Sequence, residues 1–152
     1  MTIAEFCRRH QRIGLDTNVL VHLLEDTTLR AAAAQALLDA VEDGRLKAVL
    51  ASVGLAEVVT GPARTGDGAL VERYADELRS MQGLRIEPLS ADIAVDAAVI
   101  RGTRRIGLPD AIHLATARAS GATAFVTNDR SVRSSSKLEV IYLDDLEAPG
   151  PG

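Results

Sequence analysis

Residues 13–25 read IGLDTNVLVHLLE, and this stretch joins a short apolar strand directly to a helix. The strand is expected at Ile13–Asp16. The helix is expected at Thr17–Glu25, because its leucines recur at helical spacing on one face. Asp16 therefore stands at the junction of a strand–helix unit.

The same alternation continues along the chain. Further strands are expected at Leu46–Ala51, Leu84–Leu89, Thr123–Thr127 and Glu139–Leu143. Further helices are expected at Leu29–Glu42, from an N-cap at Ser52 to Gly61-Pro62, at Ala69–Met81, at Ala91–Arg104 behind Ser90, and from Pro109 to about Ser120. Strands that alternate with helices predict an α/β fold with a parallel sheet covered on both faces.

Composition predicts one domain in a reducing compartment. A chain of 152 residues without an internal repeat is expected to form a single domain over residues 1–146, with a disordered tail at 147–152. The single cysteine excludes an internal disulfide, which favours the cytosol. No signal peptide is apparent, and the longest apolar run, residues 48–59, is too short and too polar to span a bilayer. We expect a cytoplasmic protein with no membrane partner.

Charge is distributed unevenly along the sequence. The net charge is −4, yet residues 101–137 hold seven Lys and Arg against two acids. A basic segment that encloses two isolated acids resembles a phosphate-binding rim around a metal site. The same arginines could equally solvate helix ends and loops, and charge alone favours neither interpretation.

Two acids are placed where strands end. Asp16 ends the first strand, and Asp129 follows the strand Thr123–Thr127 by two residues. Ligands of open parallel sheets bind beyond the carboxyl ends of the strands. Each acid taken singly could instead be a turn residue, because Asp is common after strands.

Glu57 and Asp110 stand out through their surroundings. Glu57 is the only charged residue between positions 48 and 63, among small and apolar residues. This pattern predicts a helix covered on both sides, in which a carboxylate must be paired or bind a cation. Asp110 is similarly isolated, although an acid in the first turn of a helix also complements the helix dipole.

These four carboxylates predict a site for a divalent cation. Like charges brought together raise each other's pKa unless a cation neutralises them. Oxygen ligands without a cluster of Cys or His favour Mg²⁺ or Mn²⁺ over zinc. Because Mg²⁺ is commonly shared with a substrate phosphate, the predicted chemistry is hydrolysis of a phosphodiester by activated water.

Four short motifs give the chain a specific resemblance. They are GLDTNVLVHLLE at residues 14–25, GLAEVV at 54–59, LPDAIHLATA at 108–117 and FVTNDR at 125–130. Together they resemble the PIN-domain family and, within it, the VapC-type toxins of bacterial toxin–antitoxin pairs. The resemblance runs from Ile13 to about Leu143.

The resemblance implies a fold, an activity and a set of site residues. The fold is a three-layer α/β/α sandwich with a parallel central sheet, and the activity is that of an endoribonuclease. Asp16, Glu57, Asp110 and Asp129 are then the metal-binding and catalytic residues. Asn18 and Thr127 are expected to support the site by hydrogen bonding to a carboxylate or to water. Arg130 and Arg133 are candidate phosphate contacts.

The resemblance also implies partners. We expect an RNA substrate, a protein antitoxin that inserts an Arg or Lys near the acids, and a homodimer. The apolar face of Thr17–Glu25 and Leu29–Glu42 is a candidate groove for the antitoxin helix, although its inward residues are expected to pack on the sheet. For His113, one turn after Asp110, the sequence favours a packing role over a place in the site.

Other functional classes remain open at this stage. A PIN-domain nuclease of RNA processing would have the same sequence features as a toxin. A haloacid-dehalogenase-like phosphatase also begins with an Asp after its first strand, but needs a second Asp where this chain has Asn18. A phospho-accepting receiver module would need its acid at a strand end and a late Lys in the sheet, whereas Glu57 lies in a helix and Lys137 in a loop.

Overall fold

A five-stranded parallel sheet forms the centre of the protein. The computed structural model describes residues 1–25, 29–135 and 137–150. The strands are β1 (Arg12–Leu15), β2 (Lys47–Ala51), β3 (Leu84–Glu87), β4 (Ala124–Thr127) and β5 (Glu139–Tyr142), in the spatial order β3-β2-β1-β4-β5. All neighbouring strands are parallel, so their carboxyl ends share one edge of the sheet.

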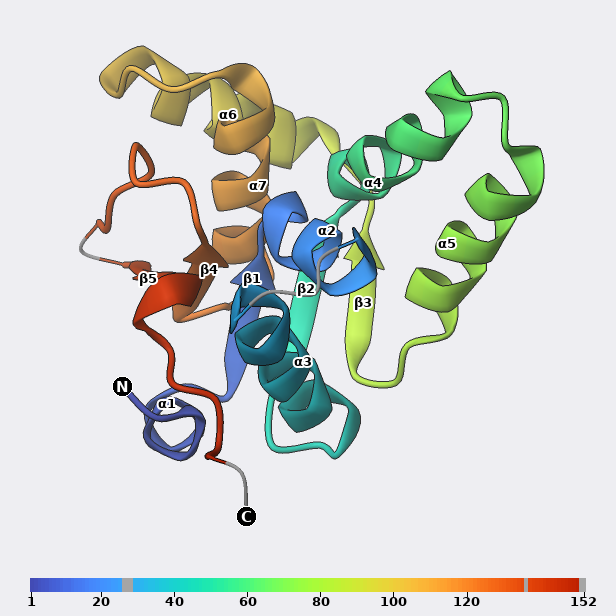
Figure 1. The fold of residues 1–152 in the computed structure, drawn as a ribbon. Helices are drawn as coiled ribbons and strands as arrows, with labels where there is room; N and C mark the ends of the chain where they lie inside the picture. Colours follow the sequence, from blue (N-terminus) through green and yellow to red (C-terminus); the bar gives the residue numbers. More distant parts are fainter. Residues whose placement is uncertain (26–28, 136, 151–152) are drawn as a thin grey trace.

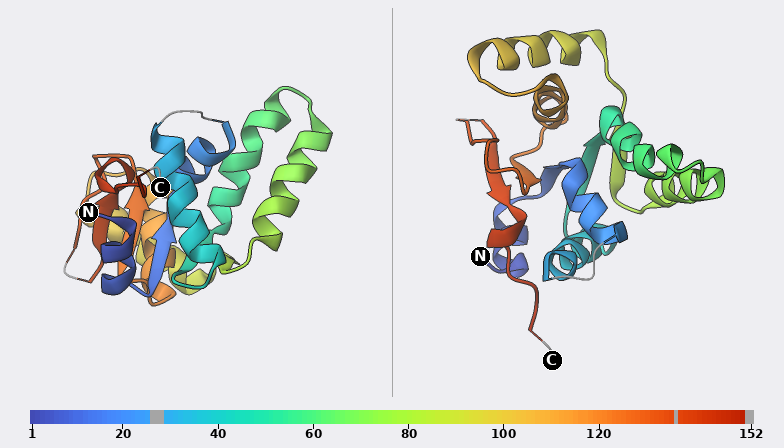
Figure 2. Two further views of the ribbon diagram at one scale, coloured as in Figure 1. Left: turned by 60° about the horizontal axis from the view of Figure 1, so that its bottom comes forward. Right: turned by 45° about the horizontal axis from the view of Figure 1, so that its top comes forward.

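Helices cover both faces of this sheet, which confirms the α/β/α sandwich. The helices are α1 (Ile3–Arg9), α2 (Thr17–Glu25), α3 (Leu29–Glu42), α4 (Ser52–Arg64), α5 (Gly68–Ser80), α6 (Ala91–Thr103) and α7 (Leu108–Ala119), and a 3-10 turn, η1, spans Leu143–Asp145. Helices α1 to α3 lie on one face and α6 and α7 on the other, whereas α4 and α5 form a hairpin that projects beside β3 (Figures 1 and 2). Among the described residues, no helix is both long and apolar enough to cross a membrane.

Each face of the sheet has its own apolar core. The core under α1 to α3 includes Leu20, Leu37 and Leu50, all fully buried. The core under α6 and α7 includes Leu114 and Phe125. Since inward residues of α2 and α3 belong to the first core, the sheet-packing interpretation of their apolar face is correct for those residues.

Close approach of α7 to β1 positions the site. A Cβ atom on Gly14 would lie only 2.6 Å from the Cβ of Ala117, so the helix rests directly on the strand at this glycine. Helix α7 leads into β4, and the carbonyl of Ser120 at its end accepts from Arg12 at the start of β1, so its carboxyl end lies at the amino edge of the sheet and its amino end at the carboxyl edge. Asp110, in the first turn of α7, is thereby held near the end of β1.

Helix α4 differs from the sequence prediction at both ends. Ser52 is its first residue and not its N-cap; Ala51 precedes it without a side-chain cap, because β2 runs directly into the helix. The helix also continues through Pro62 to Arg64. Pro62 removes one helical hydrogen bond, the one that an N–H at this position would donate to the carbonyl of Val58, but only two residues of the helix follow it. Gly66, at a φ of 73°, lies just past the helix end.

The two ends of the described chain lie side by side. Thr2 and Glu5 form a reciprocal capping box at the start of α1, a helix that the sequence analysis did not predict although the T-x-x-E pattern signals it. The backbone N–H of Glu147 donates to the carbonyl of Met1 at 2.8 Å, and Glu147 forms a bridge with Thr2. Residues 151–152 of the expected tail lie outside the described residues, and its disorder stays a prediction.

Candidate active site

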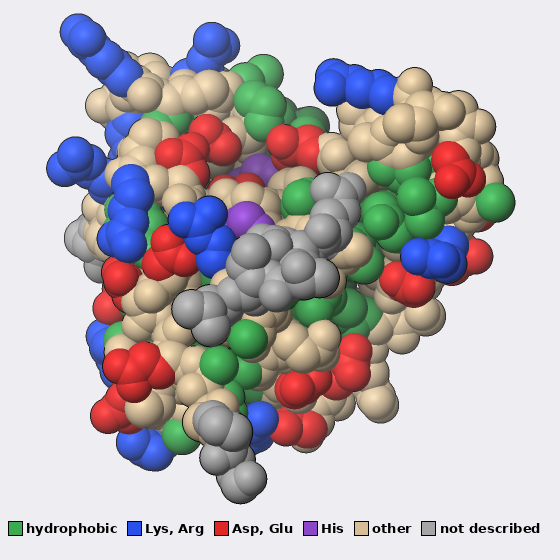
Figure 3. Space-filling view, viewed as in Figure 1, with side chains coloured by type: hydrophobic (Ala, Val, Ile, Leu, Met, Phe, Trp, Pro, Cys, Tyr) green, Lys and Arg blue, Asp and Glu red, His purple; other side chains and the backbone are tan. Residues whose placement is uncertain are grey.

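The four acids singled out from the sequence lie along the carboxyl edge of the sheet. Asp16 follows β1, Asp129 follows β4 by two residues, Glu57 lies in α4 directly after β2, and Asp110 lies in the first turn of α7. Figure 3 shows acidic side chains around a hollow between α4 and the α6–α7 pair. These four residues are called the acidic rim below.

Asp16 is the most deeply buried of the four. Its residue surface is 7% exposed, and its Oδ2 accepts hydrogen bonds from Thr127 Oγ1 at 2.7 Å and from Asn18 Nδ2 at 3.4 Å. The Asn18 side chain accepts in turn from the backbone N–H of Asn128 at 3.1 Å. Asn18 and Thr127 therefore both contact the carboxylate that they were expected to support.

The Thr127 hydroxyl also connects Asp16 with Asp129. While it donates to Asp16, it accepts from the backbone N–H of Asp129 at 3.0 Å. The Asp129 carboxylate is held by Ser131, whose N–H and hydroxyl donate to Oδ1 at 2.9 and 2.7 Å. The sequence analysis missed Ser131, which an Asp-x-Ser spacing after a strand signals as an Asx-type turn.

Glu57 is held by two donors. Its Oε1 accepts from His113 Nε2 at 2.8 Å and from Thr17 Oγ1 at 3.1 Å. The hydrogen bond from His113 is the main reason that the pKa of Glu57 lies below its ordinary value. The predicted pairing of this carboxylate is thus present, but the predicted cover on both sides of α4 is wrong. The side chain is 41% exposed because α4 projects from the sheet.

His113 belongs to the site, contrary to the packing interpretation. The ring is buried, and its Nε2 also lies 3.2 Å from Thr17 Oγ1 and 3.9 Å from Asp16 Oδ1. Gly54 leaves the space for it, because a Cβ at that position would lie 2.9 Å from His113 Cε1. Spacing of one turn from Asp110 signalled this placement, and Thr17, adjacent to Asp16, went unnoticed.

The pKa of Asp110 depends on the other three acids. Burial raises the pKa of its carboxyl group first, and the negative charges of Asp16, Asp129 and Glu57 raise that pKa further. A carboxylate feels its neighbours in this way only when they are close. The fold therefore brings all four acids into one electrostatic site.

The donor chemistry of this site fits a divalent cation. It offers carboxylate oxygens whose mutual repulsion a cation would relieve, which suits Mg²⁺ or Mn²⁺. Within residues 1–25, 29–135 and 137–150, however, no three His, Cys, Asp or Glu side chains are gathered closely enough to hold an ion as they stand. The hydrogen bonds from His113 and Thr17 reach Oε1 of Glu57, and those from Ser131 reach Oδ1 of Asp129, so the second oxygen of each carboxylate remains for a cation, which the acids would bind by moving closer together.

The arginines proposed as phosphate contacts are only partly available. Arg130 forms an ion pair with Asp145 at 3.2 Å, and its guanidinium lies 4.1 Å from the centre of the Tyr142 ring. The carbonyl of Arg133 accepts from Arg104, whereas the Arg133 side chain is exposed. Their phosphate-binding role stays a prediction.

Comparison with known proteins identifies the family. The profile of the PIN domain matches residues 13–137, which is most of the chain, and the chain belongs to the PIN domain family. No curated protein sequence matches it.

Solved structures share this fold at low sequence identity. VapBC2 from Rickettsia felis, solved bound to a promoter DNA fragment, aligns with a TM-score of 0.69 at 20% identity over 87% of this chain and 98% of that one. FitAcB from Neisseria gonorrhoeae gives 0.65 at 23% identity, over 88% and 99%. VapC20 from Mycobacterium tuberculosis, described as a sarcin-ricin loop cleaving toxin, gives 0.58 at 22% identity, over 74% and 86%.

Proposed function

We propose that this protein is a Mg²⁺- or Mn²⁺-dependent endoribonuclease that hydrolyses RNA phosphodiester bonds. The observation that carries the proposal is the convergence of the acidic rim. Thr127 joins Asp16 to Asp129, and Nε2 of His113 lies 2.8 Å from Glu57 and 3.9 Å from Asp16. The negative charges of these three acids also raise the pKa of Asp110. Membership of the PIN domain family supports a hydrolase that acts on nucleic acids. It also disfavours the phosphatase and receiver alternatives, which belong to other families.

The acidic rim would hold the cation, and the surrounding residues fix the carboxylates for that task. A bound Mg²⁺ supplies neutralisation of phosphate charge and activation of water. Thr127 and Asn18 orient Asp16, and His113 and Thr17 orient Glu57. Because these supporting groups are buried or half-buried, each carboxylate keeps its direction before a substrate arrives.

A cleavage assay tests this function directly. We expect the purified protein to cut single-stranded RNA internally in millimolar Mg²⁺ or Mn²⁺, and to stop in excess EDTA. The matching DNA oligonucleotide, run in parallel, distinguishes a ribonuclease from a nuclease of either nucleic acid. Cleavage that survives exhaustive chelation and returns only with zinc would contradict the proposed chemistry.

We propose further that the protein is the toxin of a type II toxin–antitoxin pair. The similar structures include VapBC2 from Rickettsia felis and a toxin–antitoxin complex from Klebsiella pneumoniae. Partly buried leucines of α2 (Leu23, Leu24) and apolar residues of α4 (Leu55, Val59) remain available beside the acidic rim for an antitoxin helix. A basic side chain of that helix would be attracted by the acids.

Co-expression with the upstream neighbouring gene tests the partner. We expect co-purification and loss of RNA cleavage, and recovery of cleavage when the carboxyl end of the neighbour is trimmed. A neighbour that neither binds nor inhibits would contradict the toxin assignment and favour a role in RNA processing. The homodimer and the cytoplasmic location stay predictions.

A further inference from the structure

The edge of the sheet opposite the acidic rim is basic and hollow. Two adjoining cavities of about 540 and 660 Å³ lie at the amino ends of the strands and share Arg12 and Lys47 as lining residues. Their cationic lining residues, together called the basic trough below, are Arg8, Arg9, Arg12, Arg45, Lys47 and Arg85. Among the residues that the structure describes, Glu87 is the only acid that lines either cavity.

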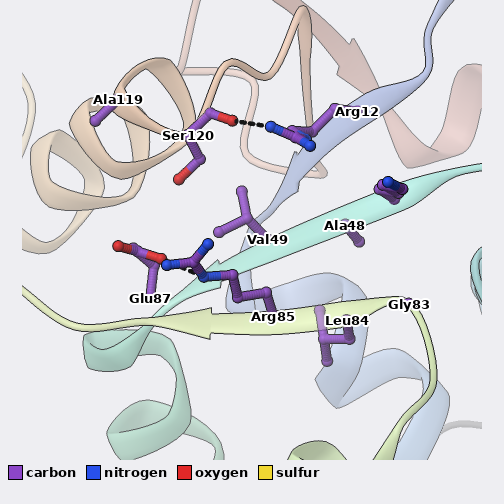
Figure 4. Close-up of a pocket in the computed structure, with 10 residues that line it drawn as sticks. Arg12, Ala48, Val49, Gly83, Leu84, Arg85, Glu87, Ala119 and Ser120 are labelled. Atoms are coloured by element: carbon purple, nitrogen blue, oxygen red, sulfur yellow. Dashed lines mark hydrogen bonds and ion pairs between the residues drawn. The ribbon is translucent and has the colours of Figure 1, made fainter.

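Part of the trough lies on sheet surface that α7 leaves open. Figure 4 shows Arg12 and Arg85 on either side of Val49, beside Ala119 and Ser120 at the end of α7. Val49 and Arg85 are partners in the pairing of β2 with β3. The floor here is apolar and buried, while Arg85 is exposed over three quarters of its side chain. Cations therefore stand around a shallow apolar surface.

Much of the charge in the trough is not neutralised. Arg9, Arg45 and Arg85 have carboxylate partners in Glu139, Asp43 and Glu87. Arg12 donates to the carbonyl of Ser120 at 2.8 Å. In the part of the chain that the structure describes, no carboxylate pairs with Arg8, Arg12 or Lys47.

A chain of net charge −4 that concentrates unpaired cations in one hollow has a surface for an anion. Five of the six cations are arginines. The planar guanidinium binds phosphate oxygens in pairs and is the side chain best suited to a phosphate backbone. None of the described residues that line the two cavities is aromatic, so the trough offers no surface on which bases could stack. The trough would then recognise the phosphate backbone and not the base sequence.

We propose that the basic trough binds the phosphodiester backbone of a folded RNA whose other segment reaches the acidic rim. This inference rests on the proposed function, because it names the class of substrate for the proposed ribonuclease activity. Strand β2 runs from Lys47 in the trough to Ala51 at the opposite edge. At about 3.3 Å per residue this is roughly 13 Å, the rise of about four stacked nucleotides. An RNA cannot follow this straight line, because helices cover both faces of the sheet, so one that touches both edges must take a longer path around them (Figures 1 and 2).

The test measures RNA binding separately from cleavage. The double variant Arg8→Glu/Lys47→Glu reverses two exposed cations that have no ion-pair partner. The matched control is Arg64→Glu/Arg79→Glu, the same charge change at last-turn arginines of α4 and α5. Both are made in an Asp129→Asn background and titrated in EDTA with a fluorescent RNA hairpin longer than the sheet, at several salt concentrations.

We expect the trough variant to raise the Kd at least about tenfold near 0.1 M salt, and to lower the slope of log Kd against log salt by roughly two, since each phosphate contact contributes about 0.9. The control pair should change the Kd less than about twofold. Cleavage is measured separately, with the native Asp129 retained. The trough variant should then cleave a short oligonucleotide at the wild-type rate, whereas its cleavage of the long hairpin should fall.

An equal loss of RNA affinity in the trough variant and in the control variant, or wild-type affinity in the trough variant, would overturn the inference. Competition by polyglutamate as strong as by RNA of equal charge would overturn the assignment to a phosphate backbone. If the long hairpin binds through the trough but no RNA is cleaved, the proposed function fails and the binding surface stands. If RNA is cleaved but the trough does not bind, only this inference fails.

Discussion

The two edges of the sheet carry opposite charges for one geometric reason. All strands are parallel, so residues that follow strands meet at one edge and residues that precede strands meet at the other. The acidic rim collects Asp16, Glu57 and Asp129 at the first edge. The basic trough collects Arg12 and Lys47, the first residues of β1 and β2, at the second. Strand direction thus separates the candidate chemistry from the candidate RNA-holding surface.

The two edges also differ in how firmly their side chains are fixed. At the rim, Asp16 and His113 are buried and hydrogen bonded to neighbouring site residues. In the trough the cations are exposed and their ion pairs are surface pairs, each contributing on the order of 0–1 kcal/mol to stability. We therefore expect rim substitutions to affect the rate of cleavage and trough substitutions to affect affinity and its salt dependence.

The largest effect is expected for Asp16→Asn. The asparagine can still accept hydrogen bonds from Thr127 and Asn18, so the fold should persist while one negative charge is removed. Cleavage of RNA should fall by about 10²–10³-fold or more, the range for removal of one transition-state contact. Initial rates in Mg²⁺ and a circular dichroism melt measure the two quantities. Wild-type cleavage would contradict the site assignment.

His113→Ala should have the next largest effect. Without the ring, the Glu57 carboxylate loses its shortest hydrogen bond, and groups that orient metal ligands typically contribute 10–100-fold, so we expect about that loss of activity. His113→Gln places an amide N–H near the same position and should recover part of the rate. The Mg²⁺ concentration for half-maximal activity should rise for Ala and less for Gln. If the two variants are equally stable and equally impaired, the ring only fills space.

Asp110→Asn should change stability with a defined pH dependence. The folded-state pKa of Asp110 lies above its ordinary 3.8, so its contribution to stability is present below pH 3.8 and is lost as pH rises through the folded value. At neutral pH the metal-free variant should therefore melt a few degrees higher than wild type. This advantage should shrink in Mg²⁺, which stabilises the wild-type rim. Melting curves of both proteins at pH 4 to 8, with EDTA or with Mg²⁺, measure this difference. A metal-free variant that melts below wild type at neutral pH would show that the neighbours of Asp110 do not repel it.

Removal of the Glu57 charge should change the stability in the opposite direction. Its folded-state pKa lies below the ordinary 4.5, so its contribution to stability is present above pH 4.5 and is lost as pH falls through the folded value. Glu57→Gln should therefore lower the melting temperature of the metal-free protein near neutral pH, in contrast to Asp110→Asn. Comparison of the two variants in the same buffers separates a paired acid from a repelled one. Equal changes in the melting temperatures of the two variants would contradict this distinction between a paired and a repelled acid.

The smallest effect is expected for Arg130→Ala. This arginine is already paired with Asp145 and lies over Tyr142, so it is not free to bind phosphate without losing those contacts. We expect KM for RNA to rise only a few-fold and kcat to be unchanged. A loss comparable to that of Asp16→Asn would contradict this ranking and place Arg130 in the reacting site.

The sequence was sufficient for the alternation of elements and for the four acids. Hydrophobic spacing and turn residues indicate the five strands and the helices α2 to α7 locally, because they are properties of neighbouring residues, whereas α1 was not predicted. The isolation of Glu57 in an apolar segment is equally local. What stayed hidden were contacts between distant segments, such as His113 with Glu57 and Thr17. Such contacts depend on helix packing, which in this protein requires the small residues Gly14 and Gly54.

By itself, the sequence determined the fold class and singled out the carboxylates that are candidates for the site, since strand–helix order fixes the edge at which a residue emerges. Only the tertiary structure decided that Thr127 links Asp16 to Asp129, that His113 orients Glu57, and that the α4 helix leaves Glu57 partly exposed. It alone also gathered Arg8, Arg45 and Arg85 into one trough. These cations are far apart in the chain, and a charge cluster that forms by folding leaves no local pattern to read.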